Sequence, residues 1–411
     1  MTVMRAEAQR NFSFVGHSGL EGRGDAMQVM VERGYAFLGH RISRGISVVD
    51  VRDPRRPTPV NFVPIHRNSW SIHLQTHGDL MVAVEELDFK SFISQKDYYA
   101  GSIPNMHSSH FGRRGVDFSA GMRVYDISDP RNPRPIGFLE VEGLGIHRIF
   151  WIGGRYAYAS AILDGYTDHI LIIVDLQDPT RPVEVGRWWM PGMWAAGDER
   201  PRGKGRIALH HAVVADDVAY ASWRDGGLTI LDVKDKSNPV LVAHRNWSPP
   251  FAGGTHSALP LHDRGLLVVA DEAVLDIDQE PMKHTWMLDI RVPENPVTIA
   301  TFPIPGDQDY VRKGGHFGPH NLHENRPGSF QSSTTIFATY QNAGLRAFDI
   351  TNPFRPEEVG YFVQATPETW FEPLRGRTKV LHAGDVFVAA DGLAYITDYD
   401  SGLTIAEWKG A

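Results

Sequence analysis

The stretch Leu171-Ile172-Ile173-Val174-Asp175, followed by the turn Asp178-Pro179-Thr180-Arg181-Pro182, decides the fold because the chain repeats it. Runs of β-branched and apolar residues favour a strand. An Asp-Pro pair favours a tight turn, because proline fixes φ and the aspartate accepts bonds from the amides that follow. Copies recur at intervals of about 60 residues. The other copies end at these acidic residues: Asp50, Asp126, Asp232, Asp289, Asp349 and Glu407.

Further β-forming runs lie on both sides of each copy, which gives four short strands per repeat. Seven such repeats predict an all-β chain, a single seven-bladed β-propeller domain over residues 1–411. The last repeat runs out after its third strand, at residues 402–408. Residues 11–16 resemble the outer strands of other repeats, so we expect this N-terminal strand to complete the last blade. That pairing removes two open sheet edges.

The repeat resembles that of the LVIVD-repeat β-propeller family, whose name residues 171–175 nearly spell. The resemblance covers the whole chain and implies the propeller fold. It implies no particular chemistry, because the repeat is not tied to one activity.

Composition narrows the function classes. The 411 residues carry a net charge of −8, with neither a basic stripe nor a long apolar run, so we expect no nucleic-acid partner and no membrane partner. The absence of cysteine excludes disulfides and thiolate metal sites. We expect a cytoplasmic protein, since the first residues lack the apolar core of a secretion signal. Nothing in the sequence determines the oligomeric state.

One long segment interrupts the repeat. Residues 87–120 form an insertion in the second blade that is rich in phenylalanine and tyrosine, including Tyr98 and Tyr99. Long insertions of this kind are often functional. We therefore predict a lid over the mouth of the propeller channel.

The 19 histidines are about twice the ordinary share, and five of them occupy similar places in the repeat. Aligning the innermost strands puts one polar residue near the top of each: Gln28, His73, His147, His211, His256, His320 and Asp385, with His382 as an alternative in the last blade. One residue of misalignment would turn a side chain to the opposite face. Five histidines at such positions nevertheless predict a shared site.

Neutral imidazoles are common ligands of transition metals. We predict that one ion of iron, manganese, zinc or copper is bound by His147, His211, His256 and His320. An all-imidazole shell disfavours Ca²⁺ and Mg²⁺. Acidic residues at the ends of second strands could orient the ligands; these are Glu85, Glu86, Asp225, Asp271 and Glu272. His107, His110 and His323 are not expected as ligands, although the sequence does not decide whether His73, His323 and His382 join the site.

The histidine ring predicts a metalloenzyme that acts on a small, partly apolar substrate, aromatic or terpenoid-like, most readily by oxygen-dependent oxidation or cleavage. The predicted catalytic residues are His73, Arg224, Asp225 and Glu86. The arrangement resembles that of carotenoid-cleavage oxygenases, propellers that hold iron with four histidines, without a shared sequence motif. A metal-dependent hydrolase or lyase and a non-catalytic protein-binding propeller remain alternatives, and a calcium-dependent lactonase is the weakest. No serine-centred nucleophile motif is evident.

Overall fold

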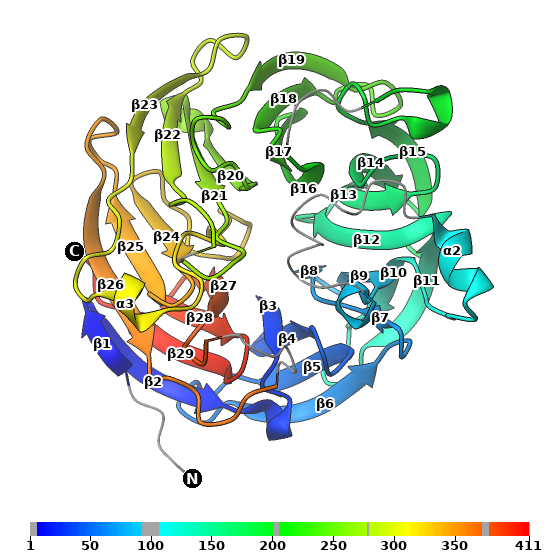
Figure 1. The fold of residues 1–411 in the computed structure, drawn as a ribbon. Coiled ribbons are helices and arrows are strands. Elements are labelled where there is room, and N and C mark those ends of the chain that lie inside the picture. The colour runs from blue at the N-terminus through cyan, green and yellow to red at the C-terminus, as the bar shows by residue number, and fades with distance from the viewer. Residues whose placement is uncertain (1–5, 93–106, 201–204, 278, 372–377, 411) are drawn as a thin grey trace. The chain divides into compact units, whose positions relative to one another are not determined.

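The computed structural model consists almost entirely of antiparallel β-sheets, which confirms the all-β prediction (Figure 1). It describes residues 6–92, 107–200, 205–277, 279–371 and 378–410. The chain divides into two units. Unit 1 comprises residues 1–43, 47–62 and 256–411, and unit 2 comprises residues 44–46 and 63–255. Among the described helices, none has the length and apolar character needed to cross a bilayer.

Unit 2 contains the strands of three successive repeats. The first group is β7 (Ser69–Trp70), β8 (Leu74–His77), β9 (Leu80–Leu87), β10 (Gly121–Asp126) and β11 (Arg134–Glu140). The second is β12 (Gly143–Phe150), β13 (Tyr156–Leu163), β14 (His169–Asp175) and β15 (Val183–Trp188). The third is β16 (Ile207–Ala215), β17 (Val218–Arg224), β18 (Leu228–Asp232) and β19 (Val240–Arg245). Short helical segments are η2 (Phe89–Ser91), α2 (Ser108–Arg113) and η3 (Ala195–Gly197).

Unit 1 contains four groups of strands. The first is β3 (Ala26–Glu32), β4 (Tyr35–His40), β5 (Gly45–Asp50) and β6 (Thr58–Pro64). The second is β20 (Thr255–Leu261), β21 (Leu266–Asp271), β22 (Thr285–Asp289) and β23 (Val297–Thr301). The third is β24 (Thr335–Thr339), β25 (Leu345–Asp349), β26 (Glu357–Gln364) and β1 (Ala6–Arg10). The fourth is β27 (Ala383–Val388), β28 (Leu393–Asp398), β29 (Gly402–Trp408) and β2 (Phe12–Ser18). The helical segments of unit 1 are η1 (Leu20–Gly22), η4 (His262–Arg264) and α3 (Tyr310–Lys313).

The two chain ends share a sheet, as the sequence predicts. β2 pairs antiparallel with β29, with Phe12 opposite Trp408 and Ser18 opposite Leu403 (Figure 1). The preceding strand β1 was not predicted; it pairs with β26 and so extends the neighbouring sheet. The N-terminal segment therefore bridges the last two sheets of unit 1.

The repeated acidic residues make the turns that the sequence suggests. Each aspartate that ends a third strand accepts a bond from the amide two residues later, at 2.7–3.1 Å. The aspartates are Asp50, Asp126, Asp175, Asp232, Asp289 and Asp349. These local bonds satisfy amides that leave the sheet, which explains why the repeat ends in an aspartate.

Glycine allows close packing at two kinds of position. A Cβ on Gly227, which precedes β18 and has φ +80°, would lie 2.2 Å from the carbonyl oxygen of Arg245 in the adjacent strand β19. A Cβ on Gly16 in β2 would lie 2.1 Å from the carbonyl oxygen of Pro54, in the turn after β5. The second contact shows that the first and last sheets of unit 1 pack against each other.

The hydrophobic core of unit 1 lies between neighbouring sheets. One cluster joins Phe337 and Phe362 of the third sheet to Phe12, Ile396 and Ala406 of the fourth. Apolar residues on both faces of each sheet thus become buried, which accounts for the near-continuous apolar runs in the sequence.

A polar network is buried in the first sheet of unit 1. His40 Nε2 lies 2.8 Å from the hydroxyl of Ser47, and His40 Nδ1 lies 3.3 Å from Asp25 Oδ1. Asp25 Oδ2 also accepts the amides of Ile42 and Ser43, at 2.6 and 2.7 Å. The order Ser–His–Asp is that of a hydrolase triad, which the sequence did not suggest. Asp25 and His40 are 0% exposed and Ser47 is 2% exposed, so no substrate reaches them. The network is structural.

We expect Asp25→Ala to lower the free energy of unfolding by about 3–5 kcal/mol, because it leaves several buried donors without an acceptor. Ser47→Ala removes a single bond and should cost about 1 kcal/mol. Urea unfolding of both variants measures the difference, with the exposed Asp263→Ala as control. A loss below about 1 kcal/mol for Asp25→Ala would contradict the structural role.

Candidate functional site

The predicted histidines fall in both units, and all five are buried. His73, His147 and His211 belong to unit 2, and His256 and His320 belong to unit 1. Each unit contains a cluster in which a buried glutamate contacts histidines. The prediction that His147, His211, His256 and His320 bind one ion spans both units and stays a prediction.

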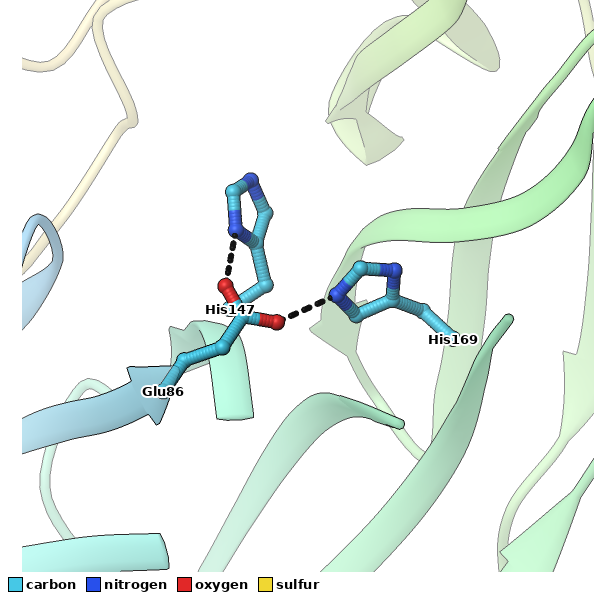
Figure 2. Close-up of side chains that lie close together, drawn as sticks. All are labelled: Glu86, His147 and His169. Atoms are coloured by element: carbon cyan, nitrogen blue, oxygen red, sulfur yellow. Dashed lines mark hydrogen bonds and ion pairs between the residues drawn. The ribbon is translucent and has the colours of Figure 1, made fainter. Parts of the chain in front are cut away.

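In unit 2 the cluster is centred on Glu86, at the end of β9. Its Oε2 lies 3.0 Å from His147 Nδ1, and its Oε1 lies 2.7 Å from His169 Nε2 (Figure 2). The three side chains offer ligand atoms that all lie within 4.8 Å of one another. This places Glu86 and His147, both predicted site residues, in direct contact.

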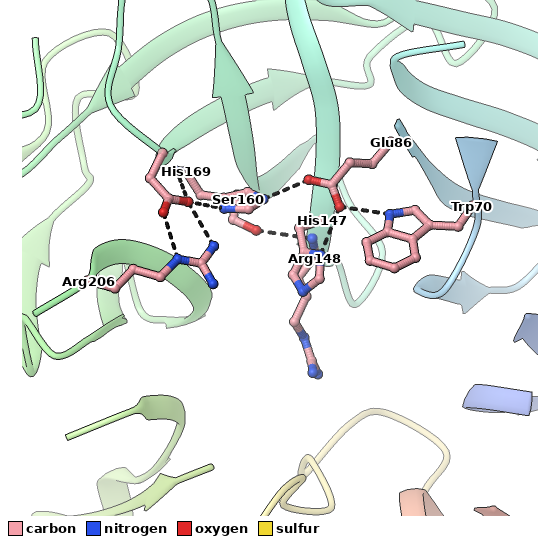
Figure 3. Close-up of polar contacts among 8 residues, drawn as sticks. Trp70, Glu86, His147, Arg148, Ser160, His169 and Arg206 are labelled. Carbon is pink, nitrogen blue, oxygen red and sulfur yellow. Dashed lines mark hydrogen bonds and ion pairs between the residues drawn. The ribbon is translucent and has the colours of Figure 1, made fainter. Parts of the chain in front are cut away.

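Further charged and polar groups surround the Glu86 cluster (Figure 3). The indole Nε1–H of Trp70 donates to Glu86 Oε2 at 2.8 Å. His169 Nδ1 lies 2.7 Å from Asp168 Oδ1, and Arg206 forms two bonds to the Asp168 carboxylate, at 2.6 and 2.9 Å. A buried chain therefore runs from Arg206 through Asp168, His169 and Glu86 to His147.

The chain of contacts perturbs the titration of its members. Burial favours the neutral form of Glu86, but the imidazoles of His147 and His169 override it and lower the pKa of Glu86 to about 2. Burial lowers the pKa of His147 to about 4. For His169 the effect of burial is outweighed by Glu86 and Asp168, which raise its pKa. Near neutral pH, Glu86 is ionised and His147 is neutral.

His169 was missed by the sequence analysis because that analysis considered only innermost strands. His169 begins β14, the third strand of its sheet. The sequence held one signal: most copies of the repeat have glycine five residues before the acidic residue, but this copy has Ile170, preceded by Asp168 and His169.

The neighbouring residues His210 and His211 contact different histidines. The His210 ring lies 5.0 Å from that of His147, whereas the His211 ring lies 5.8 Å from that of His73 (centroid distances). Successive side chains of a strand point to opposite faces. In unit 2, His210 rather than the predicted ligand His211 is therefore the neighbour of His147.

Hydrogen bonds settle the roles of several other histidines. His73 Nδ1 accepts the amide of Ile149 at 3.2 Å, so a neutral His73 carries its proton on Nε2 and presents a donor rather than a metal ligand. His323 uses both ring nitrogens, donating to the carbonyl of Phe330 and accepting the amide of Val388. His382 likewise donates to a carbonyl and accepts an amide. None of these three presents a lone pair to an ion.

In unit 1 the cluster is centred on Glu272, directly after β21. Its Oε2 lies 3.4 Å from His256 Nε2, and its Oε1 lies 3.3 Å from His320 Nε2. The two imidazole rings are 4.7 Å apart between centroids. The all-imidazole shell expected from the sequence therefore has a carboxylate in contact with two of its members.

The tautomer of His320 is fixed by its second nitrogen. His320 Nδ1 donates to the carbonyl oxygen of Gly384, which can only accept. In a neutral His320 the lone pair of Nε2 then faces the carboxylate of Glu272. Two acceptors at 3.3 Å repel each other unless a cation, either a proton or a metal ion, lies between them.

The remaining predicted residues lie near the Glu86 cluster. Arg224 ends β17, is buried, and lowers the pKa of His147 in addition to the larger effect of burial. Asp225 Oδ2 accepts the amide of Arg206 at 2.8 Å, and its Oδ1 accepts that of Gly254 at 3.1 Å. Asp225 thus connects the segment that contains Arg206 to the segment that contains Gly254, both in unit 2.

The predicted lid is described only in part, since residues 93–106, including Tyr98 and Tyr99, lie outside the described residues. Ser108, at the start of α2, donates its amide to Asp164 at 2.8 Å, which ties the insertion to the end of β13. The ring of Phe111 packs against Phe92 and Phe118, with centroids 5.4 and 6.3 Å apart. The role of a lid stays a prediction.

Comparisons with known proteins identify the repeat and the fold. The model of a family described as "LVIVD repeat" matches residues 23–62, 148–189 and 212–246. No curated protein matches the chain significantly.

Solved structures similar to the chain include β-propellers. The β-propeller domain of Cps50 (Swd1) from Myceliophteria thermophila is 12% identical, with a TM-score of 0.54, covering 94% of this chain and 98% of that domain. The periplasmic gluconolactonase PpgL from Pseudomonas aeruginosa is 11% identical, with a TM-score of 0.53, covering 98% and 97%. The computationally designed protein Ika8 is 9% identical, with a TM-score of 0.51, covering 97% and 100%. At these identities the likeness shows the propeller fold alone.

The burial of His323 predicts a pH-dependent stability. Burial lowers its pKa to about 4, whereas in the unfolded chain it titrates near 6.5. The unfolded state therefore binds a proton first, and stability is lost as the pH falls from 6.5 toward 4, by about 3 kcal/mol from this residue. Urea unfolding across this pH range tests the prediction. His323→Gln should show a shallower pH dependence, and the exposed His262→Gln should match the wild type. Equal slopes in all three proteins would contradict it.

Proposed function

From the LVIVD repeats matched in three segments of the chain, we propose that it is a seven-bladed β-propeller metalloenzyme holding one transition metal ion. The proposal of seven blades is supported by the four strand groups in unit 1 and the three in unit 2. The packing of the first sheet of unit 1 against its last supports ring closure at the chain ends. The full-length coverage of the similar propellers supports the same architecture.

The contact between His320 and Glu272 is the observation that carries the metal proposal. Ligand atoms of one ion, each about 2.1 Å from it, lie about 3.0–3.4 Å apart when they are neighbours in its shell. The separations of 3.3 and 3.4 Å from Glu272 to His320 and His256 match this spacing. A divalent cation would also remove the repulsion between the Nε2 lone pair of His320 and the carboxylate.

His147 is proposed as a further histidine ligand. His211 was predicted as the fourth, but its ring lies beside that of His73, and the neighbour of His147 is His210. His147 suits the role of a ligand because its Nδ1 donates to Glu86, which leaves the Nε2 lone pair for an ion. Metal-binding histidines usually have this arrangement. An ion bound by the imidazoles of His147 and His320 is more readily iron, manganese, zinc or copper than Ca²⁺ or Mg²⁺, because these transition metals accept imidazole ligands.

Within this set, His256, His320 and Glu272 form a group of two histidines and one carboxylate, which is typical of non-haem iron oxygenases, so Glu272 favours oxygen-dependent oxidation or cleavage. When bound, such an ion supplies the site for activating dioxygen. The chain itself supplies positioning: His73 presents an Nε2–H donor, and the buried Arg224 supplies a positive charge near His147. The apolar neighbours Trp70 and Phe150 fit a small, partly apolar substrate.

Elemental analysis of protein purified without a histidine tag tests the metal proposal. We expect about one equivalent of a transition metal. His320→Ala and Glu272→Ala should each lower it severalfold, while the exposed His262→Ala should retain it. Wild-type protein without metal, or full metal content in both site variants, would refute the proposal. Loss of metal in His147→Ala and His211→Ala as well would support a single shared ion.

Dioxygen uptake with a panel of small aromatic and terpenoid substrates tests the reaction class. We expect uptake that depends on substrate and on bound metal, because no protein group in the described site supplies an oxidant. Turnover that continues unchanged under anaerobic conditions would instead favour the hydrolase or lyase alternative.

A further inference from the structure

Glu86 is a fully buried carboxylate whose two oxygens both contact histidines of unit 2. We infer that Glu86, clamped by His169 and Trp70, is a positioning residue that holds His147 in the Nδ1–H tautomer and thereby directs its Nε2 toward a ligand. The identity of that ligand as a metal rests on the proposed function. The tautomer of His147 does not rest on the proposed function, because it follows from contacts within unit 2.

The first step concerns His169, which lies between two carboxylates (Figure 3). Its Nε2 is 2.7 Å from Glu86 and its Nδ1 is 2.7 Å from Asp168. An ionised carboxylate can only accept, so both ring nitrogens must donate and His169 is an imidazolium. Asp168 is held in its ionised form by two bonds from Arg206, at 2.6 and 2.9 Å.

The second step concerns the charge of the whole chain of contacts. Arg206 and His169 contribute two positive charges, and Asp168 and Glu86 contribute two negative charges. These four charges sum to zero, and the buried Arg224 near His147 adds a positive charge, so a further proton on His147 would leave uncompensated positive charge. His147 is therefore neutral and has one N–H.

The third step assigns that N–H. Glu86 Oε2 faces His147 Nδ1 at 3.0 Å (Figure 2). The same oxygen accepts the indole N–H of Trp70 at 2.8 Å (Figure 3). Because the carboxylate only accepts, the His147 proton resides on Nδ1 and its lone pair on Nε2. Among the described residues, His147 Nε2 makes no hydrogen bond, and the side chain is 10% exposed. The Nε2 lone pair is thus left for a ligand by the contacts that hold Nδ1.

The contacts of the Glu86 carboxylate therefore have two different roles. Trp70 and His169 fix the position of Glu86, and Glu86 fixes both the ring orientation and the tautomer of His147. A carboxylate partner also makes the imidazole more basic and a better ligand, and loss of such a partner typically weakens metal binding about 10–100-fold.

Nitrogen NMR of metal-free protein with ¹⁵N-labelled histidine tests the tautomer directly. His147→Gln and His169→Gln identify the two signals by their disappearance. In the wild type we expect the Nδ1–H tautomer for His147 and a doubly protonated ring for His169 at neutral pH. An Nε2–H tautomer at His147 would overturn the inference, and this measurement requires no folded Glu86 variant.

Glu86→Gln and Glu85→Gln form a matched pair for the positioning role. Glu85 is the adjacent buried glutamate, but it pairs with Arg123 and not with a histidine. In Glu86→Gln we expect mixed tautomers at His147 and a fall of about 10–100-fold in metal affinity, while Glu85→Gln leaves both unchanged. Equal metal affinity in both variants would overturn the positioning role. A wild-type protein with the expected tautomer but no bound metal would refute the proposed function and leave the tautomer assignment standing.

Discussion

A carboxylate buried away from water must be neutralised by a cation or by several hydrogen-bond donors, and this constraint organises both histidine clusters. Glu86 and Glu272 occupy similar places, at the end of the second strand of a sheet, and each contacts a histidine near the start of the next sheet. For Glu86, the cation belongs to the protein: the imidazolium of His169. For Glu272, the contacting atoms include His256 Nε2 and the lone-pair nitrogen of His320. A similar framework thus gives a closed charge network in one unit and, in the other, the carboxylate–histidine contact on which the metal proposal rests.

Much of the fold follows from the sequence because it depends on local chemistry. The aspartate that ends each third strand accepts an amide two residues later, so the turn is encoded within a few residues. The pairing of β2 with β29 follows from an incomplete last repeat. The strand β1 was missed because nothing local distinguishes a second outer strand from a solvent-exposed terminus. The buried network of Asp25, His40 and Ser47 was missed for a similar reason, since its members belong to different strands and a loop.

The candidate site was less predictable than the fold. The repeat alignment identified histidines on innermost strands, and two of them, His147 and His320, have the tautomer of a metal ligand. It could not identify His169, which comes from a third strand, nor distinguish His210 from His211, which differ by one residue and contact different rings. Such errors arise because strand register, rather than composition, decides the direction of a side chain.

An imidazole can bind an ion only through a nitrogen that keeps its lone pair, and the hydrogen bond at the other nitrogen decides which one does. That partner usually comes from a distant part of the chain: Ile149 for His73, Val388 for His323, and Gly384 for His320. His73 and His323 accept an amide, whereas His320 donates to a carbonyl. Histidines of equal burial and similar position in the repeat therefore have opposite chemical roles, and the distinction lies in the backbone groups of neighbouring strands. For this reason, histidines at equivalent positions of the repeat predict that a site exists, whereas their tautomers determine which of these histidines can bind an ion.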